Sequence, residues 1–139
     1  MEKAENTRER KASCSCGNLT VATRGEHLEV AACSCLDCQR RSGSAFTYIA
    51  SYSDTAVSIA GDRKVWRSQS DSGRWVESEF CPTCGVTVCY RMESLPETTW
   101  VCVGCFADSG FAKPDLLTWA SRRHRWLTFP EGIELLETE

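Results

Sequence analysis

Grouped cysteines are the strongest chemical signal in this sequence. Of the ten cysteines, seven fall into three groups: Cys14 with Cys16, Cys33 with Cys35 and Cys38, and Cys81 with Cys84. Short spacings such as Cys-x-x-Cys form a tight turn that brings both sulfurs to about 2.3 Å from one zinc ion. A glycine directly follows the first and the last group, and glycine tolerates the positive φ that such a turn often needs. The grouping therefore predicts metal binding.

The number of ligands in each group predicts two different zinc sites. The two pairs together supply the four thiolates of a closed tetrahedral site, which is typical of structural zinc. The triple supplies three ligands and leaves a fourth position open, as catalytic zinc sites do. Zinc bound by three thiolates carries less negative charge than zinc bound by four, so it is the better Lewis acid. We therefore expect two zinc ions per chain, one structural and one catalytic.

Spacing alone leaves alternatives to this division. Either pair could share part of the triple, and the fourth position of the triple could be closed by one of four residues: Cys89, Cys105, His27 or His124. Cys89 and the pair Cys102/Cys105 lie in strand-like runs, where residues three apart face opposite sides. We therefore interpret these cysteines as packing residues, and His124, which lies in a basic run, as a surface histidine.

Two arginines follow the triple directly. Arg40 and Arg41 could bind the carboxylates of a substrate, because a guanidinium forms paired hydrogen bonds with a carboxylate. The alternative is a solvated pair of surface charges.

Composition narrows the class of protein. The chain of 139 residues has a hydrophobic fraction of 42%, a charged fraction of 25% and a formal net charge of −3, which fits one globular domain. A negative net charge without a basic, aromatic stripe argues against nucleic-acid binding and against binding to an anionic membrane.

No apolar run approaches the ~20 residues of a transmembrane helix. The N-terminus lacks the apolar core of a secretory signal, so we expect a cytoplasmic protein with free thiols. No feature specifies an oligomeric state.

The elements that must position the cysteines are mainly strands. Alternating or β-branched runs predict strands at 19–23, 28–31, 46–50, 56–59, 64–68, 74–78, 86–90 and 99–103. Glycine, aspartate and serine turns between them favour antiparallel hairpins. We also expect a short helix at 116–123 and a closing edge strand at 126–130. The predicted divisions are a disordered lead-in at 1–12, one domain at 13–130 and a tail at 131–139.

The order of the cysteine groups resembles a known family. The segments 14–17, 33–43 and 80–85 together look like those of the glutathione-dependent formaldehyde-activating family, whose domain is shared with centromere protein V (the CENP-V/GFA domain). The resemblance implies a mostly β fold, a β-tent (Mss4-like) arrangement of small antiparallel sheets organised around zinc. It also implies that Cys14, Cys16, Cys81 and Cys84 are structural zinc ligands and that Cys33, Cys35 and Cys38 hold the catalytic zinc.

The same resemblance implies an activity. It predicts a zinc-dependent carbon–sulfur lyase that combines a thiol, glutathione, with an aldehyde, formaldehyde, at the open three-cysteine site. The product would be S-(hydroxymethyl)glutathione. The alternative is a non-catalytic zinc module that binds glutathione or a protein partner.

Overall fold

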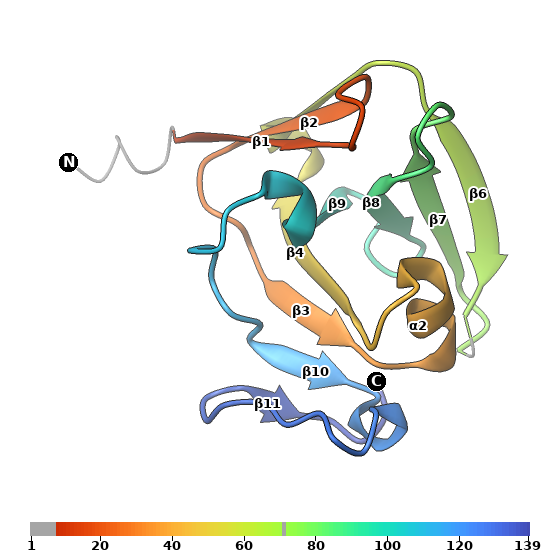
Figure 1. The fold of residues 1–139 in the computed structure, drawn as a ribbon, viewed down its shortest axis with the longest axis vertical. Coiled ribbons are helices and arrows are strands. Elements are labelled where there is room, and N and C mark those ends of the chain that lie inside the picture. Colours follow the sequence, from red (N-terminus) through yellow and green to blue (C-terminus); the bar gives the residue numbers. More distant parts are fainter. Residues whose placement is uncertain (1–7, 71) are drawn as a thin grey trace.

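The computed structural model describes residues 8–70 and 72–139, and within them two β-sheets form the body of the molecule (Figure 1). The smaller sheet has the order β1-β2-β5, with β1 at Glu9–Ser13, β2 at Thr20–Arg24 and β5 at Val57–Ala60. The larger sheet has the order β11-β10-β3-β4-β9-β8-β7-β6. Its strands are β3 (Val30–Cys33), β4 (Thr47–Ser53), β6 (Lys64–Gln69), β7 (Trp75–Phe80), β8 (Thr87–Met92), β9 (Thr98–Cys102), β10 (Leu116–Thr118) and β11 (Glu134–Leu135).

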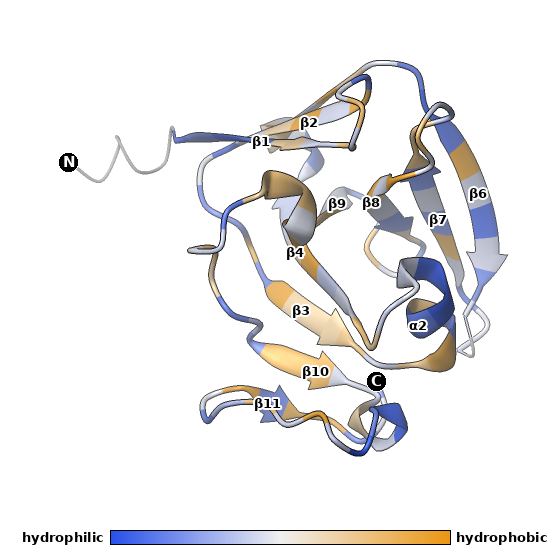
Figure 2. Ribbon diagram, viewed as in Figure 1, coloured by the Kyte–Doolittle hydropathy of each residue, from blue (hydrophilic) through white to orange (hydrophobic). Residues whose placement is uncertain are grey.

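Within residues 8–70 and 72–139, helical structure is limited to short segments. The α-helix α2 spans Leu36–Ser42, and three 3-10 turns cover Asp54–Ala56 (η1), Val103–Phe106 (η2) and Ala120–Arg122 (η3). In the part of the chain that the structure describes, these helices are too short or too polar to cross a membrane. Figure 2 shows the contrast between the apolar strands β3 and β10 and the largely hydrophilic α2.

Strand register explains why the larger sheet has two different faces. Residues directly opposite one another in paired strands share a face, and successive residues alternate between faces. Val30, Ala50, Val101 and Cys89 follow one another across four strands and are at most 1% exposed. They pack in the principal core together with buried residues of β1 and β2. This face of the larger sheet is therefore covered by the smaller sheet.

The opposite face carries a second row of apolar side chains. Ala31 pairs with Ile49, and Val76 pairs with Met92 on the same face, with Trp100 between these pairs. These residues belong to a separate apolar cluster. The two ends of the sheet approach each other, since Arg74 in the turn after β6 lies 3.0 Å from Glu139 near the chain end. The second face thus becomes the floor of a concavity.

The predicted β character is confirmed, and two local predictions are wrong. Residues 116–118 form β10 rather than part of a helix, because β10 pairs in parallel with β3 and buries Leu117 completely. Only the 3-10 turn η3 at Ala120–Arg122 is helical in the segment 116–123. The β3–β10 pairing and the parallel β10–β11 pair also depart from a purely antiparallel arrangement. Tertiary burial here overrides local helix preference. The segment 126–130 is not a strand, and the closing edge strand is β11 instead.

The predicted divisions at the two chain ends also differ from the observed strands. Residues 9–12 belong to β1 rather than to a disordered lead-in, and Ala12 there is 0% exposed. The rest of the predicted lead-in, apart from residue 8, lies outside the described residues. The predicted tail contains β11, and the Trp119 N–H donates to the Thr138 carbonyl. Alternation in β1 is masked by Arg10, a charged residue on the same side as buried Ala12, which explains why its sequence did not indicate a strand.

Candidate metal centres and the adjoining cleft

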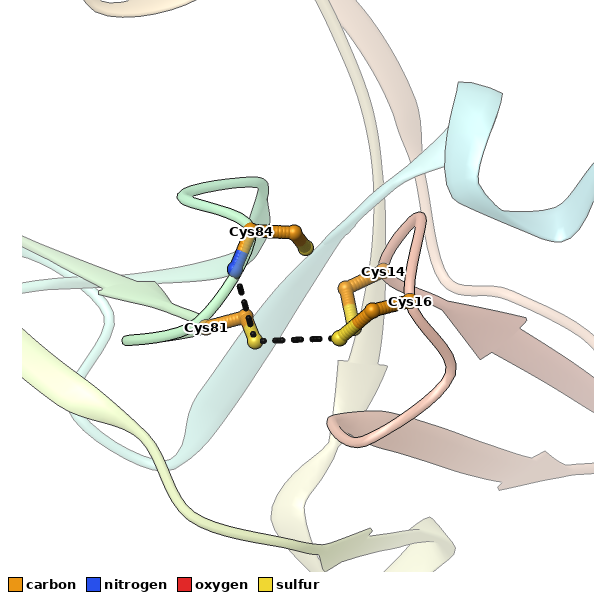
Figure 3. Close-up of side chains that lie close together, drawn as sticks. All are labelled: Cys14, Cys16, Cys81 and Cys84. Carbon is orange, nitrogen blue, oxygen red and sulfur yellow. Dashed lines mark hydrogen bonds between the residues drawn. The ribbon is translucent and has the colours of Figure 1, made fainter.

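Two turns bring the first four cysteines together. Cys14 and Cys16 lie in the turn between β1 and β2, and Cys81 and Cys84 lie in the turn between β7 and β8 (Figure 3). The Cys16 Sγ is 3.7 Å from the Cys14 Sγ and 3.6 Å from the Cys81 Sγ. All four sulfurs lie within 4.8 Å of one another. Residues 65 or more positions apart in the sequence thus form one cluster, which we call the four-cysteine cluster.

Backbone N–H groups in these turns donate hydrogen bonds to the cysteine sulfurs. The Leu19 N–H donates to the Cys14 Sγ at 3.2 Å, and the Thr83 N–H donates to the Cys81 Sγ at 3.3 Å. N–H donation from Val86 and Cys16 lowers the pKa of Cys84 to about 6. Gly85 closes the second turn with φ +81° and donates its N–H to the Cys81 carbonyl. The turn therefore stabilises the thiolate form that metal binding requires.

The sulfur spacing fits a tetrahedral metal ion. Four thiolates at about 2.3 Å from one zinc ion lie about 3.8 Å from one another. The distances from the Cys16 Sγ to the Cys14 Sγ and the Cys81 Sγ are close to this value. The donor set is soft and uniform, which suits zinc.

The remaining three grouped cysteines also converge. Cys33 ends β3, Cys35 caps the start of α2, and Cys38 lies in the first turn of that helix. The Cys38 N–H donates to the Cys35 Sγ at 3.3 Å, so the helix start itself fixes the spacing of these two sulfurs. The three sulfurs lie within 4.8 Å of one another. We call this group the three-cysteine cluster.

Electrostatics within the three-cysteine cluster favours a cation. Hydrogen bonds from the Cys33 and Cys35 thiols lower the pKa of Cys38 far below its usual range, and the Arg41 charge adds to the effect. The same contacts with Cys35 and Cys38, together with burial, raise the pKa of Cys33. The cluster thus readily carries one negative charge and resists further ones without a positive partner. A divalent cation supplies that partner, so the three thiols fit a metal as a donor set.

None of the alternative ligands joins this cluster. Among residues 8–70 and 72–139, no fourth histidine, cysteine or carboxylate is grouped with the three sulfurs. The Cys105 thiol instead donates to the Thr87 carbonyl. Burial raises the pKa of Cys89 to about 12 and that of Cys105 to about 11, so both stay protonated at neutral pH. The packing interpretation of these cysteines agrees with their positions.

The two arginines after the triple lie in different environments. The Arg41 Nη2 donates to the Cys38 Sγ at 3.4 Å, and its Nη1 donates to the Ser68 Oγ. The Arg40 side chain is 79% exposed and lies 3.8 Å from Asp37. Helical spacing separates adjacent residues by about 100°, which sends the two side chains in different directions. The structure brings Arg41, and not Arg40, to the three-cysteine cluster.

A cleft of about 230 Å³ adjoins the three-cysteine cluster. All three cysteines and Arg41 line it, together with residues from both ends of the larger sheet. Its apolar lining comes from the second face of that sheet and from the segments that close over it: Ile49, Val76, Met92, Trp75, Trp100 and Trp119. The cluster is therefore one end of a pocket with apolar walls.

Sequence reasoning located the cysteines but not the residues of this cleft. Three of the five tryptophans line the cleft, while Trp66 is 58% and Trp126 is 72% exposed. Thr47 was also missed, although it pairs with Cys33 across β3 and β4. These residues come from distant strands, so only the strand register, which spacing does not reveal, brings them together.

Comparison with known proteins places this site in a family. The model of the glutathione-dependent formaldehyde-activating enzyme family matches residues 9–122. A crystal structure of a Rhodobacter sphaeroides protein is similar over 73% of this chain and 90% of that one, with 23% identity and a TM-score of 0.54. That similarity concerns the fold alone. A search of curated proteins found no match. With both cysteine clusters inside the matched region, the chain belongs to the glutathione-dependent formaldehyde-activating enzyme family.

Proposed function

We propose that this protein joins a thiol to an aldehyde, or cleaves the resulting carbon–sulfur bond, at a zinc ion held by Cys33, Cys35 and Cys38. A second zinc ion, held by the four-cysteine cluster, would have a structural role. The observation that carries the proposal is the three-cysteine cluster at the end of a cleft, in a member of this family. Two clusters of different size in one chain support two metal sites with different tasks.

The proposed chemistry is hemithioacetal formation. Zinc bound by three thiolates would supply a Lewis acid that accepts one further ligand and favours the thiolate form of a bound thiol. In the reaction, the thiol sulfur forms a bond to the carbonyl carbon, the carbonyl π pair moves to oxygen, and the proton lost by the thiol ends on that oxygen. No oxidant or reductant is required. The reverse reaction breaks the same carbon–sulfur bond.

Arg41 is the residue of this chain best placed to assist. Its guanidinium lies against Cys38 and over the Tyr90 ring, 5.8 Å from the ring centre, so a positive charge stands beside the thiolates. It would offset their negative charge and attract a carboxylate of glutathione. Arg40, which is exposed and beside Asp37, has no comparable support for a substrate role.

The family also supplies finer expectations that remain part of the proposal. They are the β-tent arrangement around zinc, and glutathione and formaldehyde as substrates. A cytoplasmic location, which the N-terminal sequence rather than the family suggests, is proposed as well. None of the ten cysteines is in a disulfide, which is compatible with a reducing compartment.

The test combines metal counting with a direct assay of the reaction. Purified protein is analysed for zinc and then mixed with glutathione and ¹³C-formaldehyde, and NMR exchange spectroscopy measures the rate of S-(hydroxymethyl)glutathione formation. We expect about two zinc ions per chain and a rate above that of the uncatalysed mixture. Cys35→Ser should lose one zinc ion and the rate acceleration. Cys105→Ser is the matched control, because its hydroxyl can still donate to the Thr87 carbonyl.

Two results would count against the proposal in different ways. A single zinc ion per chain in the unaltered protein would reject the two-site arrangement. Two zinc ions without any acceleration, but with saturable glutathione binding, would support a non-catalytic binding module instead.

A further inference from the structure

We propose that the aldehyde bound by this protein carries an apolar substituent of about the size of a phenyl group, held in the cleft beside the three-cysteine cluster. The inference rests on the proposed function, because it names the substrate class of the same site. It goes beyond formaldehyde, which has no substituent at all. Four features of the cleft support it: the lining, the volume, unpaired hydrogen-bond donors and a strained tryptophan.

The lining of the cleft is apolar where a substituent would lie. Ile49, Val76 and Met92 project from β4, β7 and β8 onto one face of the sheet, and all three line the cleft. Trp75 and Trp119 line the same cleft from opposite ends of the larger sheet. Apolar walls with few polar groups are the usual environment of an apolar ligand group. A substrate made only of polar atoms would leave these apolar side chains exposed to water.

The volume of the cleft matches a ring rather than a single carbon. A dry apolar cavity of about 150 Å³ is sufficient for benzene. The cleft beside the cysteines measures about 230 Å³, which holds a phenyl group and the reacting carbonyl. In this arrangement glutathione enters the cleft only with its sulfur, and the rest of it lies in the adjoining hollow lined by Arg41, Thr47 and Tyr90. Formaldehyde has two heavy atoms and would fill only a small part of this space.

The orientation of such a substrate follows from donors near the cysteines. Two residues that line the cleft have a buried N–H group without a hydrogen-bond partner within the described chain: Arg41 Nε and Trp100 Nε1. Buried polar groups normally have partners, so atoms without one are candidates for ligand contact. The Arg41 guanidinium contacts the Cys38 Sγ, so its Nε lies at the cysteine end of the cleft. A carbonyl oxygen at this end would satisfy such a donor and would point the substituent toward the tryptophans.

Trp119 adds an independent observation. Its backbone has φ 54° and ψ 43°, which is a rare conformation for a bulky side chain. A hydrogen bond from the Trp119 N–H to the Thr138 carbonyl stabilises this conformation. The Arg122 guanidinium lies 5.3 Å from the centre of the indole ring. Residues in such conformations concentrate at ligand sites. Trp119 directly follows Thr118, which pairs with Cys33 across β10 and β3. The left-handed backbone at Trp119 therefore places its indole in the cleft beside the three-cysteine cluster.

The first experiment measures binding without any reaction. The zinc-loaded protein, labelled with ¹⁵N, is titrated with 2-phenylethanol and separately with ethanol, neither of which reacts with thiols. The indole N–H signals of the five tryptophans are followed by NMR. We expect saturable shifts at Trp75, Trp100 and Trp119 with 2-phenylethanol, and none with ethanol at the same concentration. Absence of saturation, or equal shifts at exposed Trp66 and Trp126, would overturn the inference.

A variant of the cleft and a control variant outside it sharpen this measurement. Trp119→Ala should weaken 2-phenylethanol binding about tenfold, because an aromatic wall is lost. Trp66→Ala is the matched control, since Trp66 is 58% exposed on β6 and does not line the cleft. Thermal melting confirms that both variants fold. Met92→Ala provides a second variant from another strand, with a weaker loss expected in the same direction.

An activity series separates this inference from the proposed function. Glutathione is assayed with phenylacetaldehyde and with formaldehyde, and we expect a kcat/KM at least about tenfold higher for phenylacetaldehyde. Acceleration with formaldehyde alone would retain the proposed function and overturn the inference. If neither aldehyde reacts faster than in buffer while 2-phenylethanol still binds at the three tryptophans, the proposed reaction fails and the apolar binding site stands.

Discussion

The two cysteine clusters use the same ligand atom but are built differently. The four-cysteine cluster joins two turns, each of which holds a chelating pair and ends in a glycine with positive φ. The three-cysteine cluster combines a strand end, a helix cap and the first turn of α2, and it faces a cleft. The four-cysteine cluster links the two sheets, whereas the three-cysteine cluster lies at one end of the cleft. The comparison teaches that the surrounding elements, rather than the cysteines themselves, distinguish a cluster enclosed between two turns from one that borders a cleft.

The largest expected effect is on stability, from loss of a ligand in the four-cysteine cluster. In Cys81→Ser, the turn after β7 loses its link to the turn after β1, and structural zinc contributes directly to folding free energy. We expect a loss of more than about 4 kcal/mol, or a fall of about 10 °C or more in melting temperature. Circular dichroism melts and zinc analysis measure both. A melting temperature within a few degrees of the unaltered protein would remove the structural role from this cluster.

The second effect is on activity and should leave the fold intact. Cys35→Ser removes one thiolate from the three-cysteine cluster, which joins no two sheets. We expect at least about a hundredfold loss of activity, with a melting temperature close to that of the unaltered protein. The assay and the melt are run on the same preparation as Cys81→Ser. If both variants melt alike, the distinction between the two clusters is wrong.

The two clusters also differ in how readily sequence reveals them. The four-cysteine cluster could be predicted because each pair is a local turn with a glycine at its end, and two local pairs add up to a tetrahedral set. The three-cysteine cluster was likewise found by spacing. The helix α2 within it was not predicted, because it is short and begins at a cysteine cap rather than at serine, threonine or aspartate.

The cleft could not be predicted for a different physical reason. Its tryptophans, Trp75, Trp100 and Trp119, lie in segments that are adjacent only after the larger sheet has formed. The parallel β3–β10 pair was also unpredictable, since the local sequence of 116–123 favours helix and only the burial of Leu117 decides against it. Local spacing thus indicated the cysteine clusters, and long-range pairing determines which residues lie next to them.

The third effect contrasts two neighbouring arginines that follow the three-cysteine cluster. Arg41→Ala removes the guanidinium that contacts Cys38, so we expect about a tenfold rise in KM for glutathione, which carries two carboxylates. Arg40→Ala changes a side chain that is 79% exposed, and KM should change less than about twofold. Steady-state kinetics at constant ionic strength measures both. Equal effects would mean that general surface charge, not the position of Arg41, attracts the substrate.

The smallest expected effect returns to the turn that holds the four-cysteine cluster. Gly85 has φ +81°, and a Cβ added there would meet no atom within 4 Å, so the cost of Gly85→Ala is conformational rather than steric. We expect a loss of about 1 kcal/mol, or about 4 °C in melting temperature. Gly104→Ala is the matched control, because Gly104 also has free space around its Cα but lies outside the left-handed region. A stability loss in Gly85→Ala, without a change in the kcat of the three-cysteine site, would separate the two clusters energetically. Equal melting of both glycine variants would mean that the positive φ of this turn contributes nothing to stability.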